Sequence, residues 1–192
     1  MDILLSANNL VKQFSGLRAV DDVSLQIEKG KSYCLIGENG SGKSTLIKLF
    51  SGVYKPTSGS ITINDKTFNH GLKPHESIRE GIDVIYQDFQ LFPNLSVAEN
   101  IMIEHMSVST KPILNWKWIY RKSEEVLARL GLKFNLSLKV LNLSTADRQL
   151  VSIAKAIVKN AKCIIMDEAT TALKKKEVDI LFSIVRELNK KG

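Results

Sequence analysis

Apolar and polar residues alternate along two stretches near the start of the chain. Residues 3–13 and 19–27 follow this period of two, which is typical of half-buried antiparallel strands. A third stretch, GSITIN at 59–64, comes after a Pro-Thr-Ser-Gly turn and has the same character. The pattern therefore predicts an antiparallel β layer in the first third of the chain.

Three short apolar runs are continuous instead of alternating. They are SYCLIG at 32–37, IDVIYQ at 82–87 and CIIMDE at 163–168. Runs of this length without polar interruptions suit strands that are covered on both faces. We expect all three as buried strands of an α/β core.

Helical periodicity dominates from Leu95 to about Val158, with further helices expected at 44–50 and 177–191. In the segment NWKWIYRKSEEVLARLGL, we expect Asn115 to be the N-cap of a helix and Gly131 to end it. The pattern predicts a core formed by 1–87 and about 151–192, with a helical insertion at about 88–150. The helix at 177–191 carries its apolar face at Val178, Ile180, Leu181, Ile184, Val185 and Leu188. Only Gly192 follows this helix, so we interpret residues 1–192 as a single truncated domain.

Composition narrows the class of protein. The 192 residues are 44% apolar and 24% charged, and they hold no apolar run of eighteen residues. The N-terminus lacks the basic and apolar regions of a secretory signal, so the expected location is the cytosol. The net charge of +7 is spread along the chain, and we expect no nucleic-acid partner. Cys34 and Cys163 lie in apolar runs and are expected to be reduced core residues.

The sharpest motif is GENGSGKS, which matches the phosphate-loop pattern G-x-x-x-x-G-K-[ST] between an apolar strand and a helix. Its glycines allow backbone N–H groups to point inward at an anion, and the following helix N-terminus adds partial positive charge. Lys43 would meet the outer phosphates, and Ser44 would offer its hydroxyl to Mg²⁺. The residues expected to bind ATP here are Gly37, Glu38, Asn39, Gly40, Ser41, Gly42, Lys43, Ser44 and Thr45.

An acidic pair, Asp167 and Glu168, ends the third apolar run. In a phosphate-loop protein, an acid at the tip of a neighbouring strand can hold Mg²⁺, and the next acid can act as general base on the attacking water. Taken alone, the pair also fits a polar strand end.

These residues together resemble the nucleotide-binding domain of ABC transporters over essentially the whole chain. The resemblance implies an α/β phosphate-loop NTPase core with an antiparallel β subdomain and an inserted helical subdomain. It implies Phe14 as the aromatic that stacks on adenine, Gln87 as a Mg²⁺ contact and sensor of the γ-phosphate, and Glu168 as the catalytic base beside Lys43. It also implies a magnesium site at Ser44, Gln87 and Asp167. Taken alone, Phe14 at a strand end favours a core position over a role in binding. The order and spacing of the motifs carry the resemblance.

LSTADRQ resembles the family's signature motif, which binds the ATP held by the opposite subunit. Its expected contacts are Ser144, Thr145, Ala146 and Asp147. Ser144 is also predicted to be the N-cap of the helix that follows. The common form of the motif has Gly and Gln where this chain has Thr145 and Asp147, and an added Cβ and an added carboxylate would weaken the site that this motif completes. Lys174 is a further departure, because relatives often have Asp there.

The segments around 88–101 and 71–87 resemble monosaccharide importers of the ribose and galactose type. This resemblance implies an ATPase that powers solute import from the cytoplasmic face of the membrane. Its implied partners are transmembrane permease subunits, a second nucleotide-binding domain and, indirectly, a solute-binding protein. Two alternatives stay open: a soluble ABC-type ATPase acting on ribosomes or nucleic acid, and a phosphate-loop kinase.

The family's switch histidine should follow the strand after the last helix. The histidines of this chain are His70, His75 and His105, all of which precede the acidic pair. We therefore expect residues 1–192 to bind nucleotide and to hydrolyse it poorly or not at all.

Overall fold

The computed structural model describes residues 2–86, 90–108, 114–167 and 173–191. The chain forms two compact units. The first contains residues 1–84, 162–167 and 188–192, and the second contains 85–161 and 168–187. The division into a core and an insertion at about 88–150 remains a prediction.

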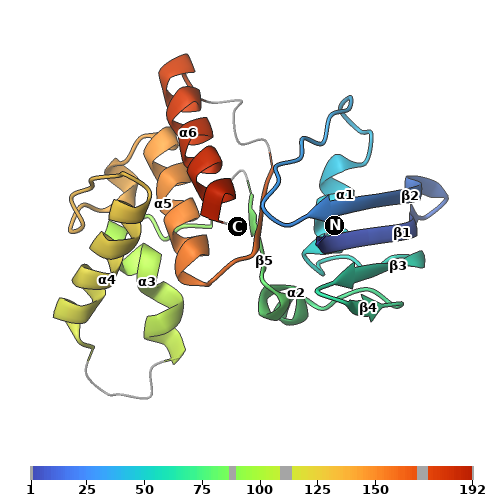
Figure 1. Ribbon diagram of the computed structural model, residues 1–192, viewed down its shortest axis with the longest axis horizontal. Helices are drawn as coiled ribbons and strands as arrows, with labels where there is room; N and C mark the ends of the chain where they lie inside the picture. The colour runs from blue at the N-terminus through green and yellow to red at the C-terminus, as the bar shows by residue number, and fades with distance from the viewer. Residues whose placement is uncertain (1, 87–89, 109–113, 168–172, 192) are drawn as a thin grey trace. The chain divides into compact units, whose positions relative to one another are not determined.

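A four-stranded antiparallel sheet dominates the first unit (Figure 1). Its strands are β1 (Ile3–Phe14), β2 (Leu17–Glu28), β3 (Ser58–Ile63) and β4 (Lys66–Phe68), in the order β2-β1-β3-β4. The first half of β1 is buried from Leu4 to Ala7, and Leu5, Ala7 and Leu10 are at 1% exposure or less. The patterns at 3–13, 19–27 and 59–64 thus predicted β1, β2 and β3 correctly, whereas β4 was not predicted.

Helix α1 (Lys43–Phe50) packs on this sheet through its apolar face. Its residues Leu46, Leu49 and Phe50 join one buried cluster with side chains from β1, β2 and β3. Two further strands, β5 (Ile82–Ile85) and β6 (Cys163–Met166), pair with each other. The contacts of Leu46, Leu49 and Phe50 thus fix the C-terminal half of α1 to the four-stranded sheet.

The apolar run at 32–37 does not form the expected buried strand. The segment is irregular, and Ile36 is 87% exposed. A continuous apolar run becomes a strand only where a neighbouring strand completes its hydrogen bonds. In the part of the chain that the structure describes, the strands form the sheets β2-β1-β3-β4 and β5-β6, and residues 32–37 belong to neither.

The two cysteines differ from each other. Cys163, on β6, packs against the core, and burial raises the pKa of its thiol to about 11. Cys34 is exposed, because it belongs to the irregular segment. The prediction of a core position is confirmed for Cys163 and wrong for Cys34; both are free thiols.

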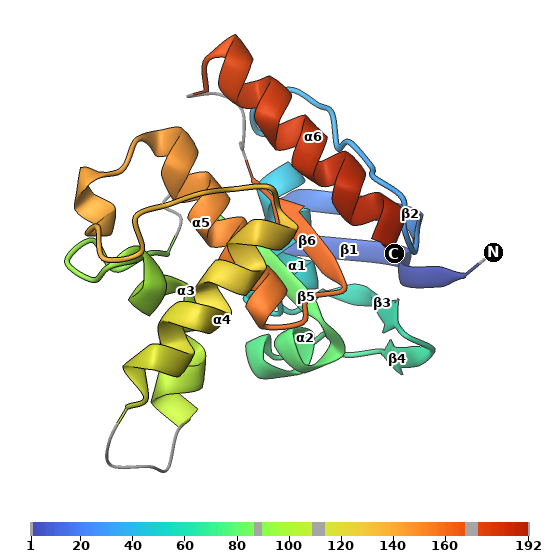
Figure 2. The same cartoon turned by 60° about the vertical axis from the view of Figure 1, so that its left-hand side comes forward.

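The second unit is helical. Helices α3 (Val97–Val108), α4 (Trp116–Arg129) and α5 (Thr145–Val158) pack against one another, as Figure 2 shows. A short 3₁₀ turn, η1 (Val140–Asn142), precedes α5, and α6 (Lys175–Lys191) follows β6. Among the described residues, no helix is long and apolar enough to cross a bilayer.

Two predicted helix boundaries are confirmed. The side chain of Asn115 accepts the backbone N–H of Trp118 at 3.0 Å and caps α4. Gly131, with φ of 68°, follows the last turn of the same helix. The predicted apolar face of α6 is confirmed in part: Leu181 and Ile184 are buried, but Ile180 is 46% exposed.

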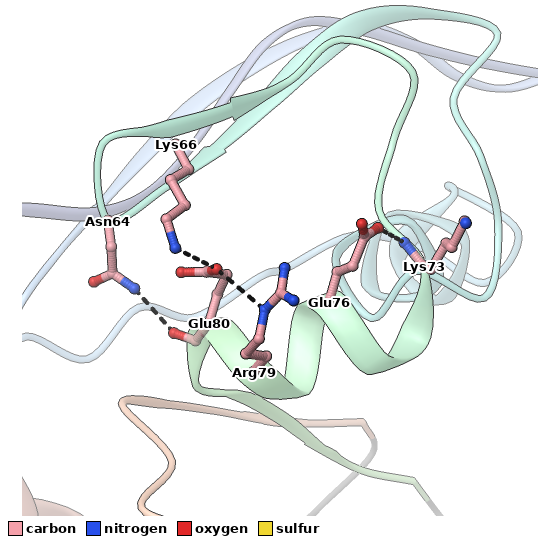
Figure 3. Close-up of polar contacts among 6 residues, drawn as sticks. All are labelled: Asn64, Lys66, Lys73, Glu76, Arg79 and Glu80. Atoms are coloured by element: carbon pink, nitrogen blue, oxygen red, sulfur yellow. Dashed lines mark hydrogen bonds and ion pairs between the residues drawn. The ribbon is translucent and has the colours of Figure 1, made fainter.

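A buried carboxylate ties the short helix α2 (Pro74–Glu80) to the β3–β4 hairpin (Figure 3). Glu80 accepts a hydrogen bond from Lys66 Nζ at 2.8 Å, and Arg79 Nε lies 3.8 Å from the same oxygen. Asn64 Nδ2 donates to the Glu80 backbone carbonyl at 2.9 Å. The hydrogen bond from Lys66 outweighs the effect of burial and holds the pKa of Glu80 below its usual 4.5.

We expect Glu80→Gln to lower the free energy of unfolding by about 1 kcal/mol at pH 7, because the charge-assisted hydrogen bond is lost. The pKa of Glu80 is lower in the folded chain, so its contribution is complete above pH 4.5 and disappears as the pH falls towards the folded pKa. Denaturant unfolding should therefore show wild type and variant converging in acid, and Lys66→Met should converge in the same way. If the free energies of unfolding of wild type and Glu80→Gln differ by the same amount at every pH, the ionised Glu80 carboxylate is not the stabilising group.

Candidate nucleotide-binding site

The predicted phosphate loop lies on the surface between the irregular segment and α1. Gly40 and Gly42 both have positive φ, at 81° and 92°. A Cβ on Gly42 would collide with the backbone carbonyl of Ala19 on β2, so only glycine lets the loop approach the sheet this closely. The packing of Gly42 therefore fixes where the loop enters the helix.

The side chain of Lys43 turns back over this loop. Its ammonium donates to the carbonyl oxygens of Gly37 and Glu38, each at 2.7 Å. The backbone N–H of Ser41 also donates to the carbonyl of Glu38, at 3.2 Å. These contacts curl residues 37–43 around one cation, and an ammonium with three donors retains one for a further acceptor.

The N-terminus of α1 differs from those of the other described helices. Gly42 offers no side-chain cap, and the first turn holds no acid. The other five helices each use a side chain at the first turn to accept a backbone N–H, namely Glu76, Ser96 with Glu99, Asn115, Ser144 and Glu177. The first N–H groups of α1 thus carry their partial positive charge without a neighbouring side-chain acceptor, as an anion-binding helix end requires.

Gly42→Ala should destabilise the first unit more than Gly40→Ala. Both substitutions place a Cβ at positive φ, which costs about 1–2 kcal/mol, but only the Cβ at 42 also strikes the carbonyl of Ala19. A Cβ at Gly40 meets no atom within 4 Å. Equal losses in denaturant unfolding would show that residue 42 does not pack against β2 as described.

Phe14 lies at the end of β1 and is 37% exposed. The alternative interpretation of Phe14 as a core residue is therefore wrong. Its ring meets Tyr54 edge to face, with centroids 5.2 Å apart. Lys12 Nζ lies 4.8 Å from the Phe14 centroid, and Lys48 Nζ lies 5.5 Å from that of Tyr54. The sequence did not indicate this cluster, since no motif connects residues 12, 48 and 54.

The expected magnesium ligands are described only in part. Ser44 is exposed on the first turn of α1, and Asp167 is half-buried directly after β6. Gln87 and Glu168 lie outside the described residues. Among the described residues, no group of three or more His, Cys, Asp or Glu could hold a metal ion. A hydroxyl and a single carboxylate fit a cation that takes its other ligands from phosphate and water.

The signature-like residues form the N-terminus of α5. Ser144 Oγ accepts the backbone N–H of Asp147 at 3.1 Å, which confirms the predicted N-cap. The same hydroxyl donates to Asp147 Oδ2 at 2.8 Å. With the first turns of α6, these residues line a small cavity that includes Ala146, Gln149, Leu173 and Glu177. Asp147 therefore places its carboxylate where the helix would otherwise offer its N–H groups to an external anion.

Ser144→Ala should lower the free energy of unfolding by about 1 kcal/mol through loss of the cap. Thr145→Ala is the matched control, because alanine at the exposed first position of α5 loses no cap and has the higher helix propensity. Thermal unfolding of the two variants separates them; equal melting temperatures would contradict the capping role.

A family model described as "ABC transporter" matches residues 20–171, which include the phosphate loop and the acidic strand end. The chain belongs to the ABC transporter family. Family membership accounts for the joint occurrence of the loop, the acidic pair and the signature-like helix start.

Curated relatives match the chain along nearly its whole length. The ribose import ATP-binding protein RbsA of Halalkalibacterium halodurans is 41% identical over 99% of this chain and 38% of its own. The D-allose import ATP-binding protein AlsA of Escherichia coli is 40% identical over 98% of this chain and 37% of its own. The chain thus spans about two fifths of the length of these relatives.

Solved structures confirm the predicted fold class. The ADP conformation of MJ1267, an ATP-binding cassette of an ABC transporter, is 30% identical and aligns with a TM-score of 0.88 over 100% of this chain and 79% of its own. A nucleotide-free ATP-binding cassette from an ABC transporter aligns with a TM-score of 0.87 at 30% identity, over 99% and 78%. The ABC ATPase fold expected from the motifs is therefore the fold of this family member.

Proposed function

We propose that this chain is the ATP-binding part of a subunit that hydrolyses ATP to drive import of a monosaccharide. The observation that carries the proposal is the curl of residues 37–43 around the Lys43 ammonium, at a helix end without a side-chain cap. A triphosphate supplies what this arrangement lacks, namely anionic oxygen acceptors for the Lys43 ammonium and for the first N–H groups of α1. Phe14, in the same unit, is an exposed aromatic on which the adenine would stack.

Mg²⁺ fits the polar residues at this site. Ser44 and Asp167 would hold it together with Gln87, and the ion would neutralise charge that builds up on the transferred phosphoryl group. Glu168 would accept the proton of the attacking water as general base. Lys43 would leave the loop carbonyls and follow the outer phosphates.

The cargo and the partners are proposed from the relatives. The two relatives described above are named for import of ribose and D-allose. A related subunit would act at the cytoplasmic face of the membrane with transmembrane permease subunits, a second nucleotide-binding domain and a solute-binding protein. These names favour import over the ribosome or nucleic-acid alternative.

The signature end of α5 supports a further detail of this proposal. The Ser144 hydroxyl donates to the chain's own carboxylate, so it has no proton left for a phosphate. Asp147 would also repel the anion. The composite ATP site completed by this motif would therefore be weaker than its counterpart in an assembled transporter.

Lys43→Ala should reduce binding of Mg²⁺ and ATP by at least 100-fold in calorimetry, because the full positive charge of the loop is removed. Lys55→Ala, an exposed lysine of the same unit, is the control and should retain affinity within about twofold. In cells, the same Lys43 substitution in the whole protein should abolish monosaccharide uptake. Wild-type affinity in the Lys43 variant would refute the role of the loop.

A further inference from the structure

The cluster around Phe14 holds two lysines whose role the proposed function leaves open. Lys12 Nζ lies 4.8 Å from the ring centroid of Phe14 and 5.8 Å from that of Tyr54. Lys48 Nζ contacts Tyr54 alone, at 5.5 Å. Within the described ranges, neither ammonium is paired with a carboxylate. The two cations therefore rest on aromatic rings in place of acidic partners.

Backbone contacts hold this cluster in a fixed position relative to α1. The N–H of Tyr54 donates to the Lys48 carbonyl at 3.0 Å, at the C-terminal end of the helix. Thr57 then connects to β1 twice: its N–H donates to the Val11 carbonyl at 2.8 Å, and its hydroxyl accepts the Gln13 N–H at 3.0 Å. The Phe14 ring and the phosphate loop thus belong to one connected frame within the first unit.

We propose that Lys12 occupies the stacking face of Phe14 in the nucleotide-free protein, and that the nucleotide base displaces it. This inference rests on the proposed function, in which adenine stacks on Phe14. An ammonium and a planar base are attracted to the same negative face of a phenyl ring, and they cannot lie on it together. Stacking of the base is the stronger contact, so binding proceeds, but it loses the free energy of the contact it replaces. Lys12 thereby lowers the contribution of the base relative to that of the phosphates.

Lys48 provides the matched control. Both lysines carry one charge in the same cluster, but Lys48 contacts Tyr54 instead of Phe14. A change in general attraction alters ATP and inorganic tripolyphosphate alike. Only loss of the competing contact alters ATP selectively, because tripolyphosphate has no base.

The test measures dissociation constants for ATP and inorganic tripolyphosphate with Mg²⁺ by calorimetry, in wild type, Lys12→Met and Lys48→Met. Methionine keeps an apolar stem of similar length and removes the charge. We expect the preference for ATP over tripolyphosphate to rise about two- to fivefold in Lys12→Met, the range expected for an exposed cation–π contact, and to stay unchanged in Lys48→Met. In a Phe14→Ala background, Lys12→Met should leave the preference unchanged.

Each other result overturns the inference. An unchanged or reduced preference in Lys12→Met shows that the lysine does not compete with the base, and an equal rise in Lys48→Met shows a general charge effect. A rise that persists without Phe14 places the competition elsewhere. If wild type binds neither ligand, the proposed function fails as well, whereas binding of both with an unchanged preference refutes only the inference.

Discussion

The hydrogen bonds from the Lys43 ammonium to the carbonyls of Gly37 and Glu38 are the interaction on which the site depends. They require a loop that can bend tightly, which the glycines at 40 and 42 allow through positive φ. They also require a firm support, which is the contact of Gly42 with β2. A loop built in this way is held in shape before a ligand arrives, so binding has to reorient the Lys43 ammonium but has little backbone left to order.

The antiparallel sheet extends this support to the other end of the proposed nucleotide. Helix α1 is anchored in the sheet core by Leu46, Leu49 and Phe50, and Thr57 connects the end of α1 back to β1 beside Phe14. The phosphate end and the base end are thus positioned by the same strands. The start of α5 shows the opposite arrangement, because Ser144 and Asp147 satisfy each other and leave the helix end occupied by its own carboxylate.

The sequence predicted what local chemistry determines. Alternating residues predicted β1, β2 and β3, Asn115 and Ser144 predicted two helix starts, and the spacing of Gly37, Lys43 and Ser44 contributed to predicting the family. It failed at 32–37, where an apolar run had to find a partner strand that the described residues do not provide. It also missed the cluster of Lys12, Phe14 and Tyr54, because Tyr54 is far from Phe14 in the sequence and reaches it only through tertiary contacts, such as those of Thr57 with β1.

A crystal structure of the protein with Mg²⁺ and ATP tests the central claim most directly. The account predicts the triphosphate inside the curl of residues 37–45, with the Lys43 ammonium moved from the two loop carbonyls onto phosphate oxygens and the metal beside Ser44. Nucleotide bound away from this loop, with Lys43 still held by Gly37 and Glu38, would contradict it.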